Sequence, residues 1–130
     1  MKEKVITVIR FLLGLMMVNA GFNKFFHYMP MPEMTQVAMD LMGAFGASGF
    51  MLPLIAITEI IAGVLLLSKR STALGAVLMM PITVNIFLFH AFLDTAGMGM
   101  GIVLLLINIA ILVSEKKRLF PMCGCDADCC

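Results

Sequence analysis

Four long apolar runs dominate this chain of 130 residues. A helix needs about 20 mostly apolar residues to cross the roughly 30 Å hydrocarbon core of a bilayer. The runs reach or approach that length, and they cover approximately residues 5–26, 50–67, 72–93 and 98–113. They predict an all-α integral membrane protein, built as a bundle of four transmembrane helices.

Basic residues sort to one side of the membrane that these runs imply. Of the nine Lys and Arg residues, only Lys24 falls near the other side, which leaves eight together. These eight are Lys2, Lys4, Arg10, Lys69, Arg70, Lys116, Lys117 and Arg118. Short loops rich in Lys and Arg stay in the cytoplasm. We therefore expect a multi-pass protein of the cell (cytoplasmic) membrane, with cytoplasmic N and C termini and residues 28–49 outside.

Composition excludes the other broad classes. A content of 62% apolar residues and a mean hydropathy of +1.05 rule out an ordinary soluble domain. The net charge is only +1, so the composition does not indicate a basic surface for nucleic acid. The lipid bilayer is the expected partner. The first run is too long for the apolar part of a signal peptide and contains Arg10, so we expect it to be retained.

The chain divides into a four-helix transmembrane domain, residues 1–118, and a flexible cytoplasmic tail, residues 119–130. The connection between the first two runs is the longest. Apolar residues recur there at helical spacing, at Met34, Val37, Ala38, Leu41 and Phe45. This pattern predicts a short amphipathic helix in the first outer loop, lying on the outer surface. A re-entrant loop is the alternative.

Glu59 is the one charged residue in the middle of the second run. A carboxylate at the centre of a membrane costs about 2.5–3.5 kcal/mol on insertion scales. Such a residue normally faces the interior of the bundle and has a partner. The sequence offers two interpretations, a functional site and a structural hydrogen bond or ion pair with Lys24.

Further polar residues gather in the outer half of the predicted bundle, whereas the inner half is nearly all Leu, Ile, Val and Met. They are Asn19, Asn23, Lys24, Asn85 and His90. We expect a polar pocket there, in which Glu59, Lys24 and His90 converge. The alternative is that the asparagines only join helices by hydrogen bonds.

A family resemblance adds to this interpretation. The first run reads RFLLGLMMVNAGFNKF from Arg10, the second reads EIIAGVLLL from Glu59, and the third ends in His90. Over most of residues 5–113 the chain resembles the DoxX/DoxD family of four-helix membrane proteins. The outer amphipathic segment and the Cys-rich tail lie outside that resemblance.

The resemblance implies a redox-associated, quinone-linked membrane subunit, such as a subunit of thiosulfate:quinone oxidoreductase. We expect a redox protein partner or a homo-oligomer. Quinone carbonyls need hydrogen-bond donors, and the candidates for binding this cofactor are Lys24, Asn19, Asn23 and Asn85. Quinol oxidation needs a proton acceptor, and Glu59 and His90 are the candidate catalytic residues.

The ends of the chain suggest an alternative function in soft-metal handling or transport. Cysteine thiolates bind Cu(I) or Zn(II), and the candidate metal ligands are Cys123, Cys125, Cys129 and Cys130. Outer methionines near Pro30, including Met29 and Met31, would suit Cu(I). Haem ligation by His27 and His90, and a membrane anchor without a pocket, are further alternatives.

Overall fold

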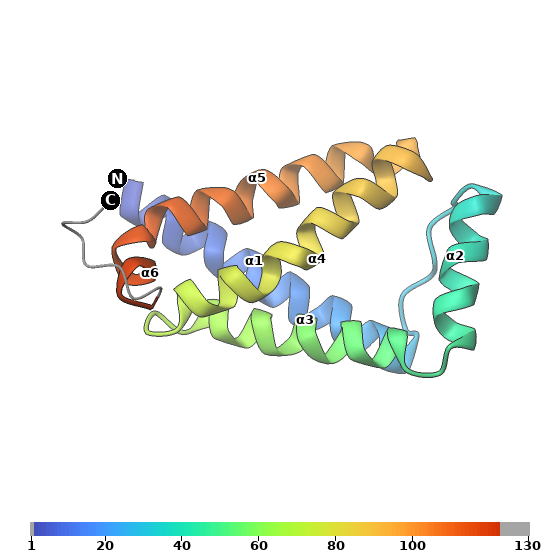
Figure 1. The fold of residues 1–130 in the computed structure, drawn as a ribbon, viewed down its shortest axis with the longest axis horizontal. Helices are drawn as coiled ribbons and strands as arrows, with labels where there is room; N and C mark the ends of the chain where they lie inside the picture. Colours follow the sequence, from blue (N-terminus) through green and yellow to red (C-terminus); the bar gives the residue numbers. More distant parts are fainter. Residues whose placement is uncertain (1, 123–130) are drawn as a thin grey trace.

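The structure, a computed structural model, describes residues 2–122 as a bundle of helices (Figure 1). In chain order the helices are α1 (Lys2–Phe26), α2 (Gln36–Ala47), α3 (Met51–Leu67), α4 (Thr72–Phe92), the short 3-10 helix η1 (Thr95–Gly97), α5 (Met98–Ser114) and α6 (Lys116–Met122). The all-helical prediction is confirmed, and the four apolar runs correspond to α1, α3, α4 and α5.

The long helices form two antiparallel pairs. α1 packs along α3, and α4 packs along α5, while α4 also joins the two pairs through its contact with α3. Figure 1 shows α4 beginning beside α3 and ending beside α5, so the pairs are close at the α6 end and spread apart toward α2. The buried core lies between the pairs and includes Leu13, Leu66, Met79 and Ile111.

Glycines bring the backbones of α1 and α3 into contact. A Cβ atom added to Gly63 would lie 2.7 Å from the carbonyl oxygen of Gly14, and one added to Gly14 would lie 2.9 Å from that of Gly63. One added to Gly21 would lie 2.7 Å from the carbonyl oxygen of Ala56. Small residues permit this close approach between membrane helices, where van der Waals packing drives association.

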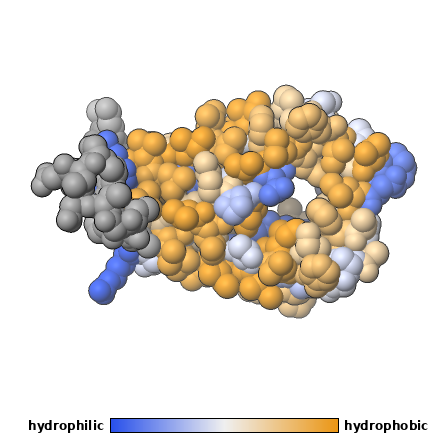
Figure 2. Space-filling model, in the orientation of Figure 1, coloured by the Kyte–Doolittle hydropathy of each residue, from blue (hydrophilic) through white to orange (hydrophobic). Residues whose placement is uncertain are grey.

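Three helical segments are long and apolar enough to cross a membrane on their own: α1, α4, and η1 with α5. α2 and α3 pass the same test only as a pair bent by 92°, which makes up to four spans. The sides of the bundle carry exposed apolar side chains, such as Leu12, Val8 and Leu106, at 61%, 57% and 59% exposure. Figure 2 shows this apolar surface, which suits contact with lipid.

Two further helices lie outside the four apolar runs, α2 in the outer connection and α6 after α5. The outer connection contains a helix where one is predicted, and Thr35 caps it by accepting a hydrogen bond from the Ala38 N–H. α6, however, continues the helical structure to Met122, past residue 118, where the sequence analysis ends the domain. α5 ends at Ser114, Glu115 departs from helical backbone with φ of −96° and ψ of 8°, and α6 begins at Lys116.

Candidate functional site

An ion pair between Lys24 and Glu59 lies inside the bundle. The Lys24 Nζ atom donates to Glu59 Oε2 at 2.6 Å, and the side-chain exposures are 24% and 4%. Lys24 is near the end of α1, and Glu59 is at the middle of α3. Helical side chains tilt toward the N-terminus of their own helix. Because α1 and α3 run antiparallel, the two side chains extend toward each other along the contact between these helices. We call this contact, formed at Gly14, Gly21 and Gly63, the glycine seam.

The glycine seam explains why this pair is buried. Gly21, one turn before Lys24, packs against Ala56 and Ile60, which flank Glu59 along α3. Glu59 is therefore drawn into the interface instead of facing lipid. A buried carboxylate requires a cation or several hydrogen bonds. Lys24 supplies the cation, and within residues 2–122 the second carboxylate oxygen, Oε1, has no recorded hydrogen bond.

His90 has a separate environment at the end of α4. Its Nδ1 atom lies 3.5 Å from Asp94 Oδ2 and 3.2 Å from the Asp94 carbonyl oxygen. Asp94 is buried, at 6% exposure. The imidazole ring occupies the space left by Gly97, and Gly101 lets α5 approach α4 beside it. Among the described residues, no hydrogen bond or ion pair is recorded between His90 and the Lys24–Glu59 pair.

We predict that Gly97→Ala displaces the His90 ring, because the added methyl group would overlap it. The expected cost in unfolding free energy is small, about 1 kcal/mol, because the ring can move away, and the main effect is loss of the His90–Asp94 contact. Gly99→Ala is the matched control, since a Cβ there meets nothing within 4 Å. Denaturant unfolding in micelles and NMR of the His90 imidazole measure the two effects. An unchanged imidazole signal in Gly97→Ala would contradict the prediction.

The predicted asparagine ligands have local partners of their own. Asn19 is exposed, and its Oδ1 and backbone oxygens accept hydrogen bonds from the Tyr28 hydroxyl at 2.5 and 2.8 Å. Asn23 Oδ1 accepts from the Met29 amide at 2.8 Å. Asn85 is also exposed, and it donates to the Pro81 carbonyl at 2.9 Å. Asn19 and Asn23 thus hold the outer connection against α1, and Asn85 bonds within its own helix.

The inner half of the bundle is more polar than expected. Arg10 is buried at 5% exposure, and it donates to the hydroxyl of the wholly buried Thr72 at 2.5 Å. Deeper in the core, Asn108 of α5 donates to Ala76 O at 3.2 Å and to Thr83 Oγ1 at 3.3 Å. Asn108 thus joins α5 to α4. The sequence signal for this contact was a lone asparagine in an apolar run, and the signal for the Arg10–Thr72 contact was an arginine inside the first apolar run.

The metal-binding prediction falls largely outside the structure. Cys123, Cys125, Cys129 and Cys130 all lie outside the described residues. Across residues 2–122, no group of three or more His, Cys, Asp or Glu side chains is placed to hold a metal ion. Near the outer loop, the Met29 sulfur accepts a hydrogen bond from Asn19 at 3.4 Å, and His27 follows α1 in the left-handed conformation, with φ of 50°.

The three to four helices that are long and apolar enough to cross a bilayer indicate a multi-pass α-helical membrane protein. The family model described as DoxX matches residues 5–91, which is more than half of the chain. This protein therefore belongs to the DoxX family. DoxX proteins are membrane-associated and are often linked to quinone oxidoreductases.

A curated relative is similar over part of the chain. It is the uncharacterized protein YwoB of Bacillus subtilis (strain 168), which is 38% identical over 60 residues. That segment spans 46% of this chain and 39% of the relative. No solved structure matches.

Proposed function

We propose that this protein is a redox-associated, quinone-linked membrane subunit whose quinone site is built on the Lys24–Glu59 pair. The observation that carries the proposal is a carboxylate with 3% exposure, in the middle of an apolar helix, with a lysine 2.6 Å away. Ionisable residues inside a membrane bundle mark functional sites by default. Membership of the DoxX family agrees with this chemistry.

The Lys24–Glu59 pair offers hydrogen-bond donors for quinone carbonyls and a carboxylate oxygen that can accept a proton. A quinone accepts and releases electrons and protons when it is bound. A lysine ammonium has three N–H donors, and the contact with Glu59 uses one of them. Glu59 Oε1 has no recorded partner among the described residues and is placed to hold a proton. Figure 2 shows a hollow toward the α2 end, with hydrophilic residues at its edge.

We also propose four spans, α1, α3, α4 and α5, with both termini in the cytoplasm and α2 on the outer surface. α3 has 17 residues, a rise of about 25 Å, which is sufficient where the bilayer thins locally. Its packing along the full-length α1 favours a span over a re-entrant loop. The basic residues at the α6 end favour the cytoplasmic side for that end. A redox protein or a second copy of the chain is the proposed partner.

Glu59→Gln should weaken quinone binding by about tenfold or more, because a neutral amide holds the Lys24 ammonium, the proposed donor to the quinone carbonyl, less strongly than a carboxylate does. The measurement is a titration of the purified protein with a short-chain ubiquinone analogue and a menaquinone analogue, alongside circular dichroism to check the fold. Thr58→Val is the matched control, since Thr58 is adjacent and, within residues 2–122, its side chain donates only to Leu54 O of the same helix, at 2.8 Å. It should leave binding within twofold.

Two results would overturn the quinone proposal. One is that the wild-type protein binds neither analogue. The other is that Glu59→Gln loses stability but keeps its affinity for quinone, which would make the ion pair structural. Binding of Cu(I) or Zn(II) by the four cysteines stays a prediction, as does the alternative of soft-metal handling. Haem ligation by His27 and His90 also stays a prediction.

A further inference from the structure

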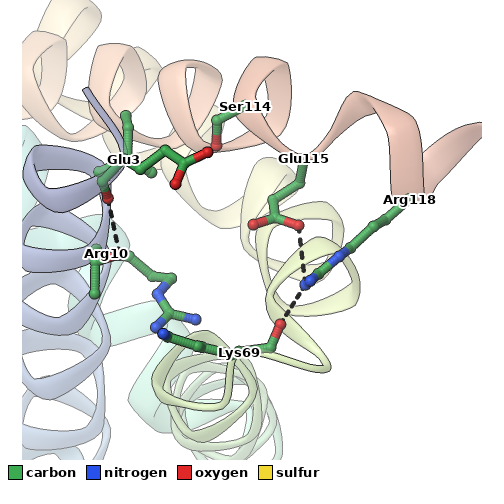
Figure 3. A pocket seen from close by; sticks show the side chains of 8 residues that line it. Glu3, Arg10, Lys69, Ser114, Glu115 and Arg118 are labelled. Atoms are coloured by element: carbon green, nitrogen blue, oxygen red, sulfur yellow. Dashed lines mark hydrogen bonds and ion pairs between the residues drawn. The ribbon is translucent and has the colours of Figure 1, made fainter. Parts of the chain in front are cut away.

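A cavity of about 340 Å³ lies at the opposite end of the bundle from α2. The start of α1, the turn between α3 and α4, and the junction of α5 with α6 form its walls (Figure 3). Its charged lining residues are Glu3, Arg10, Lys69, Glu115 and Arg118. The volume falls within the range of small-molecule sites in proteins, roughly 300–1,000 Å³. Neither the quinone proposal nor the family membership assigns this cavity a role.

The charges of this cavity are not balanced. Arg118 and Glu115 pair with each other at 3.3 Å, and Arg118 also donates to the Lys69 carbonyl. That leaves Arg10, Lys69 and Glu3, which have no ion-pair partner among the described residues. Two cations against one carboxylate give a local charge of +1. Arg10 and Lys69 both line the cavity, from α1 and from the turn between α3 and α4, so its lining carries a net positive charge (Figure 3).

Arg10 is the group that most requires a ligand. It is 5% exposed, and one hydrogen bond, to Thr72, accounts for one of its five N–H donors. A buried guanidinium without an anion is costly. Its planar fork of donors matches two oxygens of a carboxylate or a phosphate. Figure 3 shows this guanidinium directed into the cavity, beside Lys69 and across from Glu115.

The surroundings favour phosphate as the anion. The cavity opens at the end of the bundle where the basic residues gather, the level at which lipid phosphates lie against a spanning bundle. Basic pockets between membrane helices at that level bind phospholipid headgroups. We infer that this cavity binds a phosphate group, with Arg10 and Lys69 as its principal contacts. The group belongs either to a phospholipid headgroup or to free phosphate.

The test uses the full-length protein in a neutral detergent, which presents no charged bilayer surface. The two probes are a short-chain phosphatidylglycerol and inorganic phosphate, each titrated while the shift in thermal unfolding is recorded. Lys69→Gln should weaken binding of the effective probe about fivefold, the effect of one basic residue near an anionic lipid. Lys69 is exposed, so the variant should fold.

Arg70→Gln is the matched control, because it removes the same charge from the adjacent exposed residue, which does not line the cavity. It should change the affinity less than twofold, and Glu3→Gln should increase the affinity. A response to phosphatidylglycerol alone identifies a lipid headgroup, and a response to inorganic phosphate identifies a free anion. Failure of both probes, or equal losses in Lys69→Gln and Arg70→Gln, would overturn the inference.

Discussion

Lys24→Met should lower the free energy of unfolding by about 3–5 kcal/mol, the largest loss we expect from a single charge removal. The substitution keeps the length of the side chain but leaves the Glu59 carboxylate buried without its cation, and removal of one partner of a buried ion pair has a cost of this size. Unfolding by denaturant in mixed micelles at neutral pH measures the loss.

The matched control is Lys117→Met, at an exposed lysine with no recorded ion pair in the described part of the chain. It should change stability by less than about 0.5 kcal/mol. The double variant Lys24→Met with Glu59→Leu should recover most of the loss, because well-packed apolar residues replace a buried ion pair at little cost. A loss below about 1 kcal/mol in Lys24→Met would mean that the pair is equivalent to an exposed salt bridge.

Gly63→Ala should destabilise the bundle by about 2–3 kcal/mol, a large effect for one methyl group. The new Cβ atom would lie 2.7 Å from the Gly14 carbonyl oxygen and 3.1 Å from the Val18 amide nitrogen. Both are backbone atoms, so relief requires α1 and α3 to move apart. That movement would also lengthen the Lys24–Glu59 contact on the same seam, and we therefore expect weaker quinone binding in this variant.

Gly43→Ala provides the matched control within α2. A Cβ atom there meets nothing within 4 Å, and alanine is the better helix former. This variant should therefore be more stable by about 0.5–1 kcal/mol, or unchanged. Both variants add one methyl group inside a helix, and the surroundings of that group differ between them. Equal stabilities for Gly63→Ala and Gly43→Ala would show that α1 and α3 do not meet at the glycine seam.

The polar residues show which parts of the candidate site could be predicted from the sequence. Glu59 was recognisable because a lone carboxylate in an apolar run must face inward and find a partner. Its partner in the structure is Lys24. His90 and Asn85 have the same polarity and a similar predicted depth, yet they bond to Asp94 and to Pro81, respectively. Depth alone does not state which face of a helix a residue occupies after packing.

The sequence by itself determined that the chain is an all-helical, multi-pass membrane protein, because hydropathy and helix length are properties of contiguous residues. Only the tertiary structure decided which polar groups meet. Gly14, Gly21 and Gly63 set the offset and facing of α1 and α3, and that offset brings Lys24 to Glu59. The cavity around Arg10 forms between segments far apart in the chain, so no local pattern predicts it.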